Sequence, residues 1–348
     1  MFGAALAQNR AVNAEDPSER TNLEIVIVND LNNQSTAAEV ATALTKLQVG
    51  DQRSVRAVIG HYTSPITCKV LPIYSEVGIV VMSSTSTLTD LRQKCNDSNQ
   101  IFFRTTSSAE IEAKVWTAYL QNRSNLDSPK IALFYTKGED YSENLREQFE
   151  DQLSRGTVSK FDLSNQNFDA EQALENAESA DILAVFPDGG TDSSVAFNRA
   201  IEVIKGSNGE KLILGSNPLY GESVIQASGG GQTLHNKLLI AVDWDSDCGA
   251  SPDFNTYAQE IWLGPANRLV ALSYEAVQVL AAPLKSTQTW QALRNRLKNI
   301  EVNSDVFSQK RISFEQDGDR NSITNRIIVT PRQTGPGFVP IDGQFCQS

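Results

Sequence analysis

The segment Arg56–Leu91 constrains the fold more than any other part of the chain. It predicts a short buried strand at Ala57–Gly60, a hydroxyl-rich loop, a helix, a second strand at Gly78–Met82 and a second hydroxyl-rich loop. A strand–helix–strand unit of this length makes its two strands parallel neighbours, so both loops emerge at the same edge of the sheet. In open α/β sheets this carboxyl edge is where ligands bind.

The two loops offer neutral hydroxyl groups and backbone amides. Such groups suit a small anion such as a carboxylate, but they are poor catalysts without a base. Hydroxyl side chains also form loops and cap helices in most proteins, and from the residues alone this alternative stays open. The hydroxyl residues concerned are Thr63, Ser64, Ser83, Ser84, Thr85, Ser86 and Thr87.

Strand and helix patterns alternate along nearly the whole chain, which predicts an α/β fold built on parallel sheets. Near the amino end, the β-branched run Leu23–Asn29 predicts a strand. A second series of strands and helices begins at Lys130, and the chain returns after about Val242. We therefore expect two similar lobes, each a parallel sheet flanked by helices, joined by crossover strands with a ligand cleft between them. Lobe 1 is expected to comprise residues 1–105 and 243–324, and lobe 2 residues 106–242 and 325–348.

Composition excludes several classes of partner. With 348 residues, of which 40% are apolar, the chain can build two cores of ordinary size. A net charge of −12 argues against a nucleic-acid partner, which would require a basic face. No apolar run approaches the length of a membrane span, so we expect no direct membrane insertion. Met1–Asn13 lacks the basic start and apolar core of a signal peptide, so none is expected within the chain as given.

Metal and cofactor chemistry is not expected. The chain has two histidines and neither a CxxC nor an HExxH motif, which argues against a zinc site. Asp243, Asp245 and Asp247 alternate as in a calcium loop, but Cys248 stands where that loop needs its glycine. In a strand, alternating residues share a face, so this trio is better read as a solvent-facing edge.

The four cysteines allow three pairings. In an oxidising compartment we expect the disulfides Cys68–Cys95 and Cys248–Cys346, whereas four free thiols would be ordinary in a cytosolic protein. The sequence does not decide between these alternatives.

Catalysis is not expected either. A serine hydrolase needs a nucleophile elbow and a histidine base, and no G-x-S-x-G occurs. His61 lies at a strand end beside Tyr62–Ser64 and could touch a ligand there. We favour the alternative in which it hydrogen-bonds locally and orders the loop. The chain is therefore predicted not to be an enzyme.

Several motifs occur in an order shared with a known family. They are VIGHYTS, PIYSEVGI, VMSSTST, FFRT, ALFYTKGEDYSENL, ILAVFPDGG, LILGSNPLY, ALSYEAVQVLAAPL and ISFEQDGDR. Together they cover almost the whole chain, which resembles the type I periplasmic binding proteins, specifically the leucine/isoleucine/valine-binding group that serves ABC-type importers. The resemblance implies a periplasmic or other extracytoplasmic protein that captures a small carboxylate ligand by lobe closure and delivers it to a membrane permease. A ligand-sensing domain of a receptor or regulator with the same fold is the alternative.

The resemblance also implies the ligand-binding residues. Ser64 and Thr87 would bind the ligand's carboxylate through their hydroxyl groups, aided by the backbone of Thr85 and Ser86. Tyr141 would close over the ligand from the second lobe.

Asn217 departs from the family pattern. The family usually has an acidic residue just after the strand LILG, where it pairs with the ligand's ammonium. A neutral amide supplies no such charge, and burying an unpaired ammonium costs several kcal/mol in order of magnitude, roughly as for any buried charge. We therefore expect the chain to bind either an amine-free ligand such as a 2-oxo acid, or an amino acid whose ammonium pairs with another carboxylate, for which Asp188 is the best candidate. A simple role for Asn217 in a loop turn is the third alternative.

The amino end departs as well. Family members begin with an apolar strand, whereas this chain opens on GAALAQNRAVNA, which predicts a helix. The first strand of lobe 1 is therefore apparently absent, and the signal peptide that the resemblance implies would lie upstream.

Overall fold

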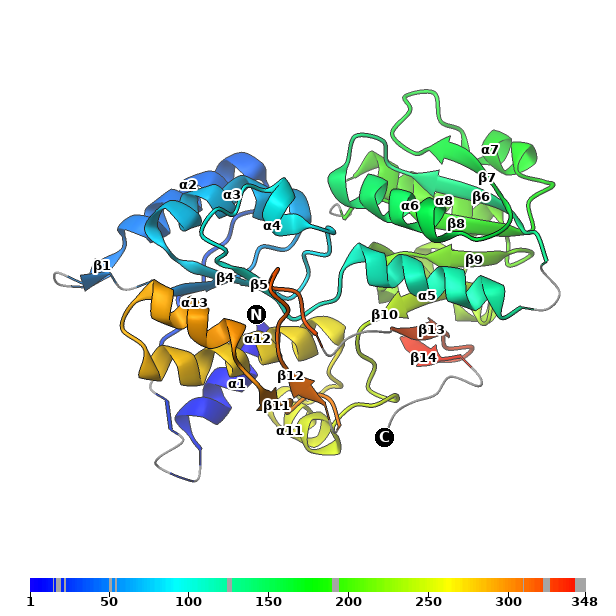
Figure 1. Cartoon of the computed structure of the whole chain (residues 1–348). Coiled ribbons are helices and arrows are strands. Elements are labelled where there is room, and N and C mark those ends of the chain that lie inside the picture. The colour runs from blue at the N-terminus through cyan, green and yellow to red at the C-terminus, as the bar shows by residue number, and fades with distance from the viewer. Residues whose placement is uncertain are drawn as a thin grey trace. The chain divides into compact units, whose positions relative to one another are not determined.

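The chain divides into two compact units (Figure 1). Unit 1 comprises residues 1–108, 244–324 and 347–348, and unit 2 comprises residues 109–243 and 325–346. The structure is a computed structural model. It describes residues 1–14, 16, 20–21, 23–49, 52–53, 55–123, 127–189, 194–308, 310–321 and 326–341.

Unit 1 is built on a parallel sheet of three strands in the order β3-β4-β5. Alternate residues of the sheet face opposite sides because side chains point up and down in turn along a strand. Val81 packs on one side with α2 and α3, while Val80 and Met82 pack on the other with α12 and α13. The strands are β3 (Ala57–Ile59), β4 (Val80–Ser83) and β5 (Phe102–Arg104).

The helices of unit 1 begin and end at recognisable caps. The Asn33 side chain accepts hydrogen bonds from the backbone of Ser35 and Thr36 at the start of α2, and Gly78 ends α3 in the left-handed conformation. The helices are α1 (Phe2–Val12), α2 (Gln34–Lys46), α3 (Ser64–Val77), α4 (Leu91–Lys94), α11 (Pro252–Trp262), α12 (Arg268–Ser286) and α13 (Trp290–Lys298). Short two-stranded ribbons join β1 (Gln48–Val49) to β2 (Gln52–Arg53) and β11 (Val302–Asn303) to β12 (Arg311–Ile312).

The strand expected at Leu23–Asn29 is wrong. Within the described part of the chain, no strand pairing includes this segment. Its β-branched residues Val26, Ile27 and Val28 are 56%, 68% and 48% exposed. The preference of such residues for strands depends on packing against a paired neighbour, and here the run has none.

Unit 2 is built on a sheet of seven strands in the order β14-β13-β10-β9-β8-β6-β7. The five strands from β10 to β7 are parallel, and β13 and β14 add antiparallel neighbours beyond β10. The strands are β6 (Lys130–Tyr135), β7 (Thr157–Asp162), β8 (Ile182–Phe186), β9 (Leu212–Gly215), β10 (Leu238–Val242), β13 (Ile327–Pro331) and β14 (Phe338–Pro340).

Each face of this sheet carries its own core. Leu133 and Ala184 pack with Trp116 and Phe149 of α5 and α6, whereas the alternate residues pack against α7, α8 and α9. The helices are α5 (Ala109–Gln121), α6 (Asp140–Gln152), α7 (Ala170–Asn176), α8 (Val195–Gly206), η1 (Asn217–Leu219), α9 (Glu222–Ala227) and α10 (Gly231–Leu234). None of the helices in the described residues combines the length and the hydropathy that a membrane crossing requires.

The disulfide expected between Cys68 and Cys95 is present. It joins α3 to the residue that follows α4. Cys248 is also disulfide-bonded. Its expected partner, Cys346, lies outside the described residues.

Candidate functional site

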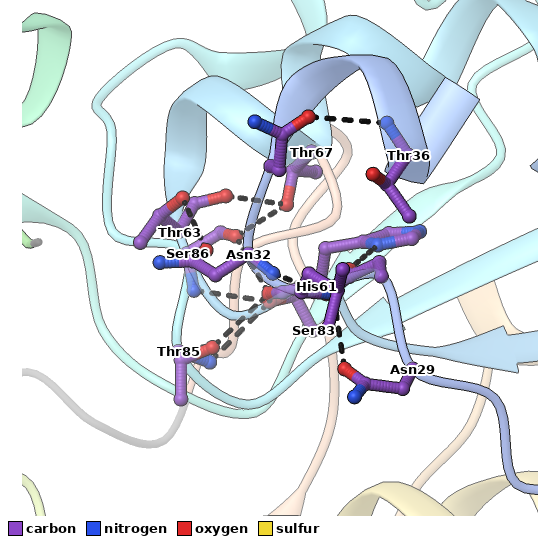
Figure 2. A network of polar contacts seen from close by, with 12 residues as sticks. Asn29, Asn32, Thr36, His61, Thr63, Thr67, Ser83, Thr85 and Ser86 are labelled. Carbon is purple, nitrogen blue, oxygen red and sulfur yellow. Dashed lines mark hydrogen bonds and ion pairs between the residues drawn. The ribbon is translucent and has the colours of Figure 1, made fainter. Parts of the chain in front are cut away.

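The two hydroxyl-rich loops of unit 1 meet around the carbonyl oxygen of His61, as Figure 2 shows. Three hydroxyl groups donate to this oxygen: Ser83 Oγ at 3.4 Å, Thr85 Oγ1 at 3.1 Å and Ser86 Oγ at 3.3 Å. One loop follows β3 and the other follows β4, and the strands are parallel neighbours. The arrangement therefore follows from the topology that the sequence predicts.

Backbone amides of the second loop are used within the protein. Thr85 N and Ser86 N donate to Ser83 Oγ at 3.3 and 3.0 Å. Thr87 N and Leu88 N both donate to Ser64 Oγ at 3.2 Å. Ser64 Oγ is thus an acceptor twice over, while neither contact uses its own proton. The Ser64 hydroxyl can therefore donate its own proton to an anion. The Thr87 hydroxyl lies on the residue whose backbone N–H donates to Ser64 Oγ.

The His61 side chain has partners on both ring nitrogens. Nδ1 lies 2.5 Å from Asp30 Oδ2, and Nε2 lies 3.3 Å from the hydroxyl of Tyr74. Burial alone would raise the pKa of Asp30, but the contact with His61 and the backbone N–H of Asn32 outweigh it and lower that pKa. These contacts support the alternative in which His61 orders the loop.

In unit 2, Tyr141 and Asn217 both contact the carboxylate of Glu112. Glu112 Oε2 accepts from Tyr141 Oη at 3.4 Å and from Asn217 Nδ2 at 3.1 Å, and Oε1 accepts from Asn217 N at 3.3 Å. Arg326 donates to Oε2 at 2.8 Å and pairs with Asp243 at 3.4 Å. We call these five residues the Glu112 cluster. Asp243 and Asp245 are 2% and 4% exposed, so the solvent-facing edge expected from their alternation is wrong.

Burial and charge both act on the Glu112 cluster. Burial alone would lower the pKa of Arg326, but the Asp243 and Glu112 carboxylates outweigh it and raise that pKa. Burial, with Glu112 beside it, holds the pKa of Tyr141 well above its ordinary value. Arg326 therefore stays charged, and Tyr141 stays a neutral hydroxyl donor.

Asp188 has different partners. Both of its carboxylate oxygens accept from Ser194 Oγ, at 3.0 and 2.7 Å, and its backbone N–H donates to Thr136 Oγ1 at 3.0 Å. Its described hydrogen bonds include none to Asn217. The structure brings Tyr141 and Asn217 together through Glu112, and it places Asp188 beside α8 instead.

Glu139 is a second carboxylate in this part of unit 2. It caps α6 by accepting from Ser142 N at 2.7 Å. Burial raises its pKa to about 7, against the opposing effect of the backbone N–H groups of Ser142 and Tyr141, and the nearby Asp188 adds to the rise. The folded protein thus binds a proton at Glu139 more tightly than the unfolded chain does.

The pKa of Glu139 predicts a pH dependence of stability. Because the folded-state pKa is raised from 4.5 to about 7, the stabilisation is fully present below pH 4.5 and is lost as pH rises through about 7. We expect Glu139→Gln to match the wild type at pH 5 and to be more stable at pH 8, by about 2 kcal/mol after allowing for partial exposure. Urea unfolding at both pH values measures this difference, and a difference that does not change with pH would contradict it.

A metal site and a surface groove are the other two kinds of candidate site. Among the described residues, no group of three or more His, Cys, Asp or Glu side chains is placed to hold a metal ion. A surface groove of about 770 Å³ runs along α2 and is lined in part by Gln34, Glu39 and Lys69. None of the ligand-binding residues expected from the sequence lines this groove.

Glu112 and Arg326 were missed by the sequence analysis. Glu112 stands between apolar positions of α5, with Ala109, Ala113 and Trp116 buried around it. A lone glutamate within the apolar face of a helix was the available signal, because such a residue is rarely buried without a partner. The partner, Arg326, is more than two hundred residues away and lies in no recognisable motif.

The two units together define a class of protein. Each has a parallel sheet covered by helices, and within the described residues the chain passes from unit 1 to unit 2 at residues 108–109 and back at residues 243–244. Polar side chains gather after β3 and β4 in unit 1 and after β9 in unit 2. This is a two-lobed α/β protein with polar loops at strand ends.

Comparison with protein families identifies the family. The model of a periplasmic binding protein family matches residues 3–326, and the chain belongs to that family. The resemblance and the α/β fold expected from the sequence are thereby confirmed. No curated protein sequence matches the chain.

Solved structures share the fold at low sequence identity. LivJ, a branched-chain amino acid transporter substrate-binding protein of Streptococcus pneumoniae in complex with isoleucine, is 18% identical with a TM-score of 0.76 over 98% of this chain and 93% of its own. A Desulfitobacterium hafniense ABC transporter substrate-binding protein in complex with Leu is 18% identical, with a TM-score of 0.76 over 97% and 94%. An R. palustris ABC transporter solute-binding protein in complex with benzoate is 15% identical, with a TM-score of 0.73 over 97% and 90%.

Proposed function

We propose that the chain is an extracytoplasmic solute-binding protein that captures a small carboxylate ligand, an amino acid or a 2-oxo acid, and delivers it to an ABC-type permease. Lobe closure upon the ligand would give the permease its signal. The observation that carries the proposal is the hydrogen bond of 3.2 Å from Thr87 N to Ser64 Oγ, at the carboxyl edge of the unit 1 sheet. The chain that contains it belongs to a periplasmic binding protein family. We propose binding without catalysis, which mass spectrometry of the recovered ligand would test.

The ligands of three structural neighbours support a carboxylate. Isoleucine, leucine and benzoate differ in their amino group and in their apolar body, but each carries a carboxylate. In this chain, the hydroxyl-rich loops of unit 1 would bind the carboxylate that these ligands share, and a second surface would bind the rest of the ligand. In this chain Tyr141, Asp188 and Asn217 of unit 2 are the proposed residues of that second surface. The disulfides agree with an oxidising, extracytoplasmic location.

A thermal-shift panel tests the proposal directly. Each amino acid is measured beside its 2-oxo acid, with benzoate as a carboxylate that lacks both groups. A ligand at about a hundred times its Kd adds about 2.7 kcal/mol of stability, which raises the midpoint by several degrees. A panel without any shift would overturn the proposal.

Ser64→Ala is expected to weaken ligand binding by about tenfold or more, because a hydrogen bond to a charged group is lost. The loss should be equal for an amino acid and its 2-oxo acid, since they share the carboxylate. Isothermal calorimetry with both ligands measures it. Ser75→Ala is the matched control, because Ser75 lies on the same helix, is buried, and its hydroxyl has no hydrogen-bond partner among the described residues. Equal losses in the two variants would argue against a role for Ser64.

A further inference from the structure

Glu112 holds both nitrogen atoms of Asn217. The backbone N–H donates to Oε1 at 3.3 Å, and the side-chain Nδ2 donates to Oε2 at 3.1 Å. A carboxylate only accepts hydrogen bonds, so the side-chain amide can face it only with its NH₂ group. Turning the amide over would place Oδ1 against Oε2, acceptor against acceptor. The orientation of Asn217 is therefore set by Glu112.

The other side of the amide has no partner. Asn217 Oδ1 is buried, and none of the described residues donates a hydrogen bond to it. Leaving a buried acceptor unpaired costs its full desolvation penalty, so such groups are nearly always satisfied. A donor that arrives with a ligand would satisfy this one.

Glu112 is itself held in place. It is fully buried and accepts from Arg326, which also pairs with Asp243. Tyr141 donates to the same oxygen as Asn217 does. The Glu112 carboxylate thus contacts Tyr141 and Asn217, two of the three unit 2 residues that the sequence analysis expects to bind the ligand; the third is Asp188. Asn217 is also the residue that stands where the family usually has an acidic one.

We infer that Glu112 is a positioning residue that presents the oxygen of Asn217 to the ligand, so that the chain selects ligands with an N–H donor over those with an acceptor at this point. The inference rests on the proposed function. An amino acid offers ammonium donors, whereas its 2-oxo acid offers a carbonyl oxygen that would meet Oδ1 as a second acceptor. At position 217 the ligand would thus meet a neutral oxygen whose orientation is set by Glu112 of α5, and Asp188 is not needed to orient it.

The test measures a preference rather than an affinity. L-leucine and 4-methyl-2-oxopentanoate, L-isoleucine and 3-methyl-2-oxopentanoate, and every further pair that shifts the thermal panel are titrated by calorimetry. The wild type is expected to bind the amino acid at least about tenfold tighter than its 2-oxo acid. In Glu112→Gln the new amide both donates and accepts, so Asn217 is free to turn over, and the preference should fall about tenfold. Asn217→Leu removes the oxygen at nearly constant shape and should lose the preference as well.

Glu275→Gln is the matched control. Glu275 is equally buried and pairs with Arg320, but it lies in unit 1 and makes no described contact with the Glu112 cluster. It should lose stability without changing the preference. A preference for the 2-oxo acids in the wild type, or an unchanged preference in Glu112→Gln and Asn217→Leu, would overturn the inference while leaving the proposed function intact. If Glu112→Gln does not fold, Asn217→Leu decides alone. A wild type that binds neither member of any pair would overturn the proposed function and this inference with it.

Discussion

Arg326→Met is expected to lower the free energy of unfolding by about 3–5 kcal/mol, more than any other single substitution considered for this chain. Arg326 is 2% exposed and lies against two carboxylates, those of Glu112 and Asp243. Methionine keeps much of the side-chain volume but removes the positive charge. Both carboxylates would then be buried without their cation, and the cost of that arrangement is the reason for the large effect. Urea unfolding followed by circular dichroism measures it.

Arg311→Met provides the comparison. Arg311 also pairs with a glutamate, Glu301, but the two side chains are 64% and 60% exposed. A surface ion pair of this kind contributes little, so the same substitution there should change stability by about 0.5 kcal/mol or less. If Arg326→Met were as mild as Arg311→Met, the Glu112 cluster would not depend on its central cation.

The buried parallel strands are predicted well from the sequence because each is a nearly continuous run of apolar residues. β6, β8 and β10 are nearly continuous apolar runs, and each is buried almost throughout. β7 is not predicted from the sequence because, among the described strands, it lies at the outer edge of its sheet and pairs with β6 alone. All six of its residues are half-buried or exposed, so its sequence shows no clear apolar pattern.

Leu23–Asn29 shows the opposite error, because here a strand is predicted from the sequence and none is present in the structure. Its β-branched residues carry a strand preference, yet a strand exists only where a neighbour accepts and donates its backbone hydrogen bonds. Whether such a neighbouring strand exists depends on the whole fold, so the local sequence pattern cannot predict it. The same limit applies to the antiparallel pairing of β13 with β10, which no local pattern predicts.

The candidate site divides along the same line. The meeting of the Ser64 loop with the Ser83–Thr87 loop follows from topology, since neighbouring parallel strands must end at one edge. The Glu112 cluster does not, because it joins α5 to residues more than a hundred positions away. From the sequence, a neutral Asn217 directs attention to Asp188 in a nearby loop, whereas in the structure the carboxylate in contact with Asn217 is that of Glu112 on α5.

The second large effect concerns the disulfide. Replacing Cys68 and Cys95 together by alanine is expected to lower the free energy of unfolding by about 3–4 kcal/mol, the value for a loop that the bond closes over 27 residues of sequence separation. The closed loop contains β4 and the hydroxyl residues from Ser83 to Thr87. Without the bond the unfolded chain explores more conformations, while α3 and β4 keep their packing in the folded state. Urea unfolding measures the loss, and refolding should slow more than unfolding accelerates.

Reduction separates the bond from the alanine substitutions. In a strong reductant the wild type also loses the bond at Cys248, so the double variant must be measured with and without reductant. When both are reduced, the wild type and the double variant differ only in having two cysteine thiol side chains or two alanine methyl groups at these positions. Because Cys95 is 3% exposed, this packing difference should be about 1 kcal/mol. The remainder of the loss belongs to the bond itself. A total loss below about 1 kcal/mol would mean that the unfolded chain is already compact between α3 and α4, and that the entropy of this loop contributes little.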